Sequence, residues 1–217
     1  DLTKKRAIVC GASKGIGKAV ASELASLGAT VTVIARTKES LEQVRNSLDT
    51  SSGQAHNSLV ADFKNHETLS ALIQDFLSEN GPAHILINNS GGPPAGPVHT
   101  AEINHFIEAF SQHLIANHIM MRAVIEGMKS EGYGRIINII STSVKIPLTG
   151  LGVSNTIRGA VANWAKTLSN ELGPLGITVN NVLPGATDTD RLAEILEGKA
   201  AKANKTIEEI ISTEQSH

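Results

Sequence analysis

The stretch that decides the fold is Cys10-Gly11-Ala12-Ser13-Lys14-Gly15-Ile16-Gly17. It directly follows a short apolar run and leads into an amphipathic helical pattern. Glycines at such a junction let the backbone turn tightly and approach a phosphate, and the N-terminus of the next helix offers unpaired N–H groups. A glycine triplet alone can also be a simple turn, but this strand-to-helix position favours a dinucleotide-binding loop. The loop residues expected to bind are Gly11, Ser13, Lys14, Gly15, Ile16 and Gly17.

The rest of the chain repeats the order of a short strand followed by a longer helical segment. Six runs rich in β-branched and apolar residues predict strands at 6–10, 30–34, 58–60, 84–88, 135–140 and 177–182. Strands that are apolar on both faces are typical of a parallel sheet covered by helices on both sides. The sequence therefore predicts an α/β fold, a doubly wound parallel sheet of the Rossmann type with right-handed crossovers.

Length and composition limit the classes of protein to consider. With 217 residues, 41% of them hydrophobic and 18% charged, we expect a single domain, 1–217. A net charge of −2 gives no electrostatic reason to expect nucleic acid or an anionic membrane as a partner. Residues 1–5 lack the apolar core of a signal peptide, and no apolar run approaches the ~18 residues of a membrane span. We expect a cytoplasmic protein that binds small molecules, without a metal.

The residue after the second predicted strand bears on cofactor choice. An NAD-specific site usually places Asp or Glu there, whereas this chain has Arg36. Together with Lys14, this guanidinium can hold a 2′-phosphate, so we expect NADP(H) in preference to NAD(H). The alternative is that both are solvated surface cations. Asp62, after the third strand, is a candidate for the adenine amino group, and a turn-forming Asp is its alternative.

Three spaced motifs together resemble the short-chain dehydrogenase/reductase family, above all its β-ketoacyl-acyl-carrier-protein reductase-like members. They are the glycine loop, Asn88-Asn89-Ser90-Gly91 after the fourth strand and Pro184-Gly185 after the sixth, and the resemblance covers about 3–191. It implies a sheet of seven strands and assembly as a homodimer or homotetramer. It also implies that Asn88, Ser90 and Gly91 line the cofactor path, that Pro184 and Gly185 open an active-site loop, and that Thr189 meets the nicotinamide carboxamide.

The resemblance also locates the catalytic positions. The family uses an asparagine, a serine, a tyrosine thirteen positions later and a lysine four positions after that. Ser141 matches the serine, but the tyrosine, lysine and asparagine positions hold Ser154, Arg158 and His113. The only tyrosine, Tyr133, precedes the fifth strand, at the sheet end opposite the ligand loops.

These substitutions exclude the family's usual proton transfer. A serine hydroxyl is a far poorer acid than a phenol with a reference pKa of about 10, and Arg158 stays charged, so it can bind ribose hydroxyls but not relay a proton. We expect instead that His113, directly or through water, protonates an alkoxide held by Ser141 while NADPH delivers hydride. The alternative is a histidine that only packs or hydrogen-bonds on a long helix.

The overall expectation is an NADP(H)-dependent oxidoreductase acting on a carbonyl or alcohol. The alternative is an NADPH-binding pseudoenzyme, or an oligomerisation partner, without turnover. Helical segments 101–130 and 153–172 match the family's subunit-pairing helices. Residues 188–213 form the expected substrate-loop region, in which Thr206 and Glu209 predict a capping box for a last short helix. The family's closing segment, a helix and a seventh strand, is not found after His217.

Overall fold

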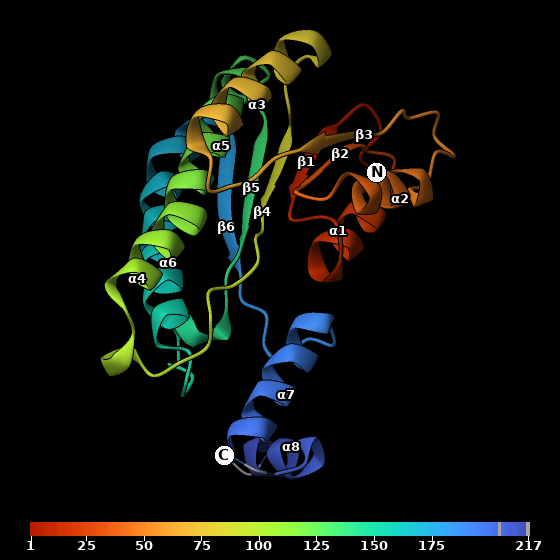
Figure 1. Ribbon diagram of the computed structural model, residues 1–217. Helices are drawn as coiled ribbons and strands as arrows, with labels where there is room; N and C mark the ends of the chain where they lie inside the picture. The colour runs from red at the N-terminus through yellow and green to blue at the C-terminus, as the bar shows by residue number, and fades with distance from the viewer. Residues whose placement is uncertain (204, 216–217) are drawn as a thin grey trace. The chain divides into compact units, whose positions relative to one another are not determined.

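A parallel sheet forms the centre of the structure, a computed structural model that describes residues 1–203 and 205–215 (Figure 1). Within these residues the sheet has six strands in the order β3-β2-β1-β4-β5-β6, and every neighbouring pair is parallel. The chain starts in the middle, moves out to one edge and returns to build the other half. The strands are β1 (Arg6–Cys10), β2 (Thr30–Ala35), β3 (Asn57–Val60), β4 (Ile85–Asn88), β5 (Gly134–Ile139) and β6 (Ile177–Val182). The predicted doubly wound Rossmann-type fold is confirmed.

Helices cover the sheet on two sides. α1 (Gly15–Ser26) and α2 (Lys38–Ser47) pack on one face, and α3 (His66–Asn80), α5 (Ala116–Ser130) and α6 (Gly152–Leu172) pack on the other (Figure 1). Successive strand residues point to opposite faces. Ile8 therefore joins the core beneath α3, α5 and α6, while its neighbour Val9 joins the core beneath α1 and α2.

β6 differs from the expectation that each strand is apolar on both faces. Its residues alternate, with Ile177 and Val179 buried and Thr178 and Asn180 exposed. α1 and α2 contact β1 and β2, at the other half of the sheet, and the same face of β6 is exposed at Thr178, Asn180 and Val182. An alternating strand of this kind needs a core on one side only.

The chain divides into two compact units, Asp1–Pro184 and Gly185–His217. The second unit contains α7 (Asp190–Ala203) and α8 (Ile207–Gln215), which pack through Leu196, Ala200 and Ile210. The predicted capping box is confirmed, because the Thr206 N–H donates to Glu209 Oε2 at 2.8 Å and the Glu209 N–H donates to Thr206 Oγ1 at 3.2 Å. Of the expected region 188–213, Asn204 lies outside the described residues.

The helical segment predicted over 101–130 is continuous but changes its winding. It consists of α4 (Ile103–Phe110), a π turn (Ser111–Ile115) and α5. No helix in the described part of the chain is both long enough and apolar enough to cross a membrane. The π turn matters for the site, because it carries His113.

Candidate active site

The glycine loop is folded tightly against the end of β4. Gly11 and Gly15 have φ values of +59° and +55°, which favour glycine, and a Cβ on Gly17 would collide with the carbonyl oxygen of Gly11. Asn89 fastens the loop, since its Nδ2 donates to the carbonyl oxygens of Cys10 at 3.3 Å and Gly11 at 3.1 Å. Sequence reasoning did not assign this clamp, although it singled out the asparagine pair after β4.

The N-terminus of α1 fits a phosphate. The helix begins at Gly15, its N-cap residue Lys14 makes no side-chain capping hydrogen bond, and its first turn carries no acidic residue. Backbone N–H groups at an uncapped helix start are the groups that bind phosphate in dinucleotide sites. Ser13 is half-buried and Lys14 is exposed at the same turn. The residues present therefore fit the pyrophosphate of a dinucleotide.

Two further predicted cofactor residues lie at the carboxyl ends of the neighbouring strands. Arg36 is exposed directly after β2, and Asp62 is exposed just after β3. Asp62 Oδ1 accepts a hydrogen bond from the Lys64 N–H at 3.0 Å, the bond of a turn-forming aspartate. Since β1, β2 and β3 are adjacent, these residues share one sheet edge with the glycine loop.

A ladder of asparagines crosses the sheet below the site. Asn88, Asn138 and Asn181 are in register on β4, β5 and β6. Asn88 Nδ2 donates to Asn138 Oδ1 at 2.9 Å, and Asn138 Nδ2 donates to Asn181 Oδ1 at 3.1 Å. Asn88 is buried, and its Oδ1 has no partner among the described residues. The expected place of Asn88 on the cofactor path stays a prediction.

Ser90 and His113 are hydrogen-bonded to each other, with Ser90 Oγ 2.7 Å from His113 Nδ1. His113 lies on the π turn with 2% of its surface exposed. Burial, helped by the positive charge of Arg158, lowers the pKa of His113 to about 3. The imidazole is therefore neutral at pH 7, which differs from the titration near pH 6.5 expected from the sequence.

The other predicted catalytic residues are grouped around α6. Arg158 Nη1 donates to the Ile139 carbonyl oxygen at 3.0 Å, and burial lowers the pKa of its guanidinium to about 10, so the charge is kept at pH 7. Ser154 is half-buried one helical turn before Arg158. Ser141 Oγ accepts from the Ser143 N–H at 3.1 Å and begins a 3-10 turn (Thr142–Val144). α6 contacts both this turn and the π turn of His113.

The remaining predicted positions lie on loops. The Gly91 carbonyl oxygen accepts from Gln112 Nε2 at 3.1 Å, and the Pro184 carbonyl oxygen accepts from the Thr142 N–H at 3.1 Å, which ties the end of β6 to the Ser141 loop. Gly185 and Thr189 belong to the second unit. There Thr189 Oγ1 accepts from the Leu192 N–H at 3.4 Å, at the start of α7.

Tyr133 lies away from all of these residues. It directly precedes β5, at the amino end of the strands, and two cations lie over its ring. Lys5 Nζ is 4.1 Å and the Arg135 guanidinium carbon is 4.2 Å from the ring centroid. The expectation that Tyr133 cannot replace the missing catalytic tyrosine agrees with this position.

Comparison with known proteins decides the family. The short chain dehydrogenase model matches residues 5–200. The chain belongs to the short-chain dehydrogenase/reductase family. It is 30% identical over 202 residues to the NADPH-dependent reductase BacG of Bacillus subtilis strain 168, covering 93% of this chain and 78% of BacG. It is also 30% identical over 199 residues to the 3-oxoacyl-[acyl-carrier-protein] reductase FabG of Pseudomonas aeruginosa, covering 92% of this chain and 80% of FabG. The predicted resemblance is confirmed.

Solved structures agree with the fold. YwfH, an NADPH-dependent reductase involved in bacilysin biosynthesis, has a TM-score of 0.87 at 30% identity, over 92% of this chain and 79% of that one. A variant of the actinorhodin polyketide ketoreductase, solved with NADPH, has a TM-score of 0.87 at 29% identity, over 95% and 79%. The L-sorbose reductase of Gluconobacter frateurii, solved with NADPH and L-sorbose, has a TM-score of 0.85 at 26% identity, over 92% and 76%.

Proposed function

We propose that this short-chain dehydrogenase/reductase is an NADP(H)-dependent oxidoreductase that reduces a carbonyl group or oxidises an alcohol. The observation that carries the proposal is the glycine loop, held by Asn89 and continued by an uncapped helix. Such a loop provides backbone N–H groups for a pyrophosphate. Similar proteins described as NADPH-dependent reductases support the same cofactor.

Selectivity for NADP(H) comes from charge at the edge of the adenosine pocket. Arg36 follows β2 at the place where a carboxylate would accept the ribose hydroxyls of NAD(H), and its guanidinium instead binds the 2′-phosphate with Lys14. Asp62 keeps one carboxylate oxygen in its turn and offers the other to the adenine amino group. Towards the nicotinamide, the binding residues of the first unit are Ser90, Gly91 and Pro184.

The substrate oxygen is held by hydroxyl groups. Ser141 and Ser154 both donate to the carbonyl oxygen, and Arg158 binds the ribose hydroxyls while its positive charge stabilises the alkoxide that forms. Bound NADPH supplies the hydride. Because Arg158 remains a cation at neutral pH, it stabilises negative charge without giving up a proton.

His113 takes part as a neutral ring. A neutral imidazole has one N–H and one lone pair, so it can accept a proton at one nitrogen while it releases another. With Ser90 at Nδ1, the ring passes a proton from the Ser90 hydroxyl to the alkoxide through water, and a proton from solvent restores the Ser90 hydroxyl. This keeps the expected relay through His113 but excludes a stored imidazolium as its proton source, because the pKa is about 3.

The experiment that tests the function is transfer of deuteride from NADPH that carries deuterium at both C4 positions to a panel of ketones, aldehydes and β-ketoacyl thioesters, followed by mass spectrometry of the products. Deuterium in a product alcohol supports the proposal. Tight NADPH binding with no label in any product would favour the alternative, an NADPH-binding protein without turnover. Ser154 and Arg158, at the tyrosine and lysine positions, are the observations that keep this alternative open.

We also propose that the protein forms a homo-oligomer through α4. Ile103, Ile107 and Phe110 follow one another at helical spacing and are 76%, 59% and 42% exposed. An exposed apolar stripe of this kind marks an interaction surface. Because members of the family assemble as dimers or tetramers, the partner that we propose for this surface is a second copy of the chain.

A further inference from the structure

The π turn that carries His113 is bound to the loop after β4 by two neighbouring side chains. Gln112 Nε2 donates to the Gly91 carbonyl oxygen at 3.1 Å, and His113 Nδ1 lies 2.7 Å from Ser90 Oγ. A π turn is a rare element, and its winding differs from that of the α-helices on either side. Further contacts are therefore needed to keep it from relaxing, and the first residue of the turn makes one to a different element.

This first residue, Ser111, is bound by His66, the first residue of α3. His66 Nε2 lies 3.2 Å from the Ser111 carbonyl oxygen and 3.1 Å from Ser111 Oγ. A carbonyl oxygen can only accept, so Nε2 carries the ring proton and donates it to this bond. The same carbonyl oxygen accepts from the Ala116 N–H, five residues later, which is the bond of a π turn. His66 therefore adds a second hydrogen bond to the carbonyl group on which the π winding depends.

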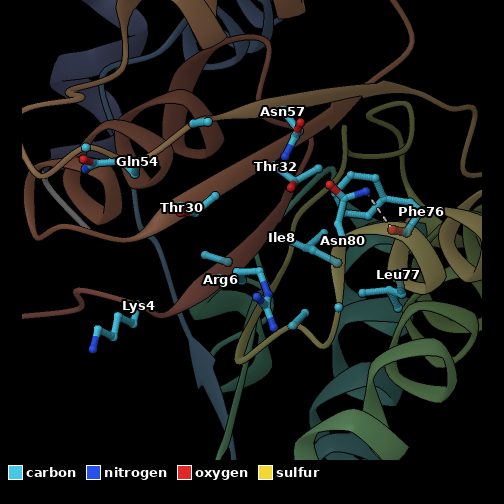
Figure 2. A pocket seen from close by; sticks show the side chains of 15 residues that line it. Lys4, Arg6, Ile8, Thr30, Thr32, Gln54, Asn57, Phe76, Leu77 and Asn80 are labelled. Carbon is cyan, nitrogen blue, oxygen red and sulfur yellow. Dashed lines mark hydrogen bonds between the residues drawn. The ribbon is translucent and has the colours of Figure 1, made fainter.

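α3 gives His66 a rigid base. Leu69 and Ile73 of this helix are buried in the core, and the helix packs against α5. Towards its carboxyl end, Leu77 and Asn80 line a hollow together with residues of β1 and β2 (Figure 2). The helix is thus held along its whole length, and a side chain at its first turn can fix a less regular element beside it.

Without the bond from His66, the turn can relax to an α-helix. The Ser111 carbonyl oxygen would then accept from the Ile115 N–H, one residue earlier, and an α-helix turns by about 100° per residue. α5 keeps its place because Ala116 and the residues one and two turns later are buried in the core. The residues before α5 must rotate instead, and His113, which is buried on this turn, would lose its place.

We propose that His66 is a positioning residue for His113, because its ring fixes the π turn and so keeps the imidazole of His113 buried beside Ser90. The inference rests on the proposed role of His113 in proton transfer. Lys64, two residues before His66, also reaches α4, where its Nζ is 2.6 Å from Glu108 Oε2. These two side chains are 47% and 59% exposed, and an exposed ion pair contributes little, so the positioning is assigned to His66 alone.

The hydrogen bond can be tested in the parent protein. ¹H–¹⁵N correlation spectra of the histidine rings at pH 8 report which ring nitrogen carries the proton. The bond to the Ser111 carbonyl oxygen requires the proton of His66 on Nε2. A proton on Nδ1 would overturn the proposal.

Two variants test the effect on His113. His66→Phe keeps a planar ring without the N–H donor, so His113 should become solvated and its pKa should rise from about 3 to above about 5. Ring ¹³C–¹H shifts of His113 during a pH titration measure this rise. His66→Gln offers an amide N–H at a similar reach, so His113 should remain neutral down to pH 5. The proposal is wrong if the pKa of His113 is unchanged in His66→Phe, or if it rises equally in His66→Gln.

Lys64→Gln is the matched control, because it removes the neighbouring ion pair to α4 and should leave the titration of His113 unchanged. A rise equal to that in His66→Phe would contradict the assignment to His66. Turnover is a separate readout: where the parent transfers hydride, kcat should fall at least about tenfold in His66→Phe and stay near the parent value in His66→Gln. A parent without hydride transfer contradicts the proposed function, while the titration of His113 still decides the role of His66.

Discussion

Ser90 Oγ and His113 Nδ1 are 2.7 Å apart, which joins the loop after β4 to the π turn between α4 and α5. The resemblance placed both residues in the site, His113 at a catalytic position and Ser90 on the cofactor path. Their pairing, with the depressed pKa of His113, gives the site a buried neutral imidazole in place of a titrating one.

Titration of His113 should appear in the pH dependence of stability. Its folded pKa of about 3 lies below the ordinary value of 6.5, so the unfolded chain binds a proton that the folded chain does not. The contribution of neutral His113 to the free energy of unfolding is complete above pH 6.5 and is lost as the pH falls towards 3. Between pH 7 and pH 5, the free energy of unfolding of the parent should fall about 2 kcal/mol more than that of His113→Asn. Urea denaturation at both pH values measures this difference.

The control for His113 is His99→Asn, because His99 is exposed. Between pH 7 and pH 5, the free energy of unfolding of His99→Asn should fall by the same amount as that of the parent. If His113→Asn also follows the parent, His113 is not the buried neutral group that we describe.

Removing the centre of the asparagine ladder should destabilise the fold. Asn138→Ala leaves Asn88 Nδ2 without its partner, and an unsatisfied buried group costs about 1–3 kcal/mol, so we expect a loss of roughly 1–3 kcal/mol. Asn181 also loses its partner but is half-buried, so water can replace that bond. Asn180→Ala, at an exposed position of β6, should change stability by less than about 0.5 kcal/mol. If the two variants lost equal amounts of stability, the hydrogen bonds of the asparagine ladder would contribute nothing to the stability of the fold.

A methyl group at Gly17 should weaken cofactor binding. The added Cβ of Gly17→Ala meets the Gly11 carbonyl oxygen and Asn89 Nδ2, so the loop must open to accommodate it. We expect NADPH affinity to fall at least about tenfold, a loss of about 1.4 kcal/mol, measured by calorimetry. Gly173→Ala, where a Cβ meets nothing within 4 Å, is the control and should bind as the parent does.

Charge on the exposed stripe of α4 should break the assembly. Ile107→Glu places a carboxylate in the middle of the surface formed by Ile103, Ile107 and Phe110, and sedimentation velocity should then show monomer at concentrations where the parent is larger. Leu27→Glu, at an exposed apolar position after α1, should sediment as the parent does. A parent that is already monomeric contradicts the proposed oligomer.

The fold could be predicted because its signals are local. Each strand is a short apolar run bounded by turn residues, so the predicted and observed strands differ by at most one residue at either end. The glycine loop was equally clear, since its position between β1 and α1 follows from the chain order. β6 was the exception, because Ile177-Thr178-Val179-Asn180 alternates and needs a core on one face only.

The site was less predictable because its key contacts are long-range. The bond between Ser90 and His113 depends on a π turn, which has no period in the sequence, and the pKa of His113 depends on burial by other elements. The ladder of Asn88, Asn138 and Asn181 depends on the register of three strands that are far apart in the chain. The proposed roles of Ser141, Ser154 and Arg158 remain predictions that hydride transfer tests.

The most direct measurement of the central claim is the thermal unfolding midpoint of the purified protein with saturating NADPH, with saturating NADH and without either. A ligand at ~100 times its dissociation constant adds about 2.7 kcal/mol, which raises the midpoint of a domain of this size by roughly 5–10 °C. We predict this shift with NADPH, a much smaller one with NADH, and loss of the difference in Arg36→Ala. No shift with either nucleotide, or equal shifts with both, would contradict NADP(H)-dependent function.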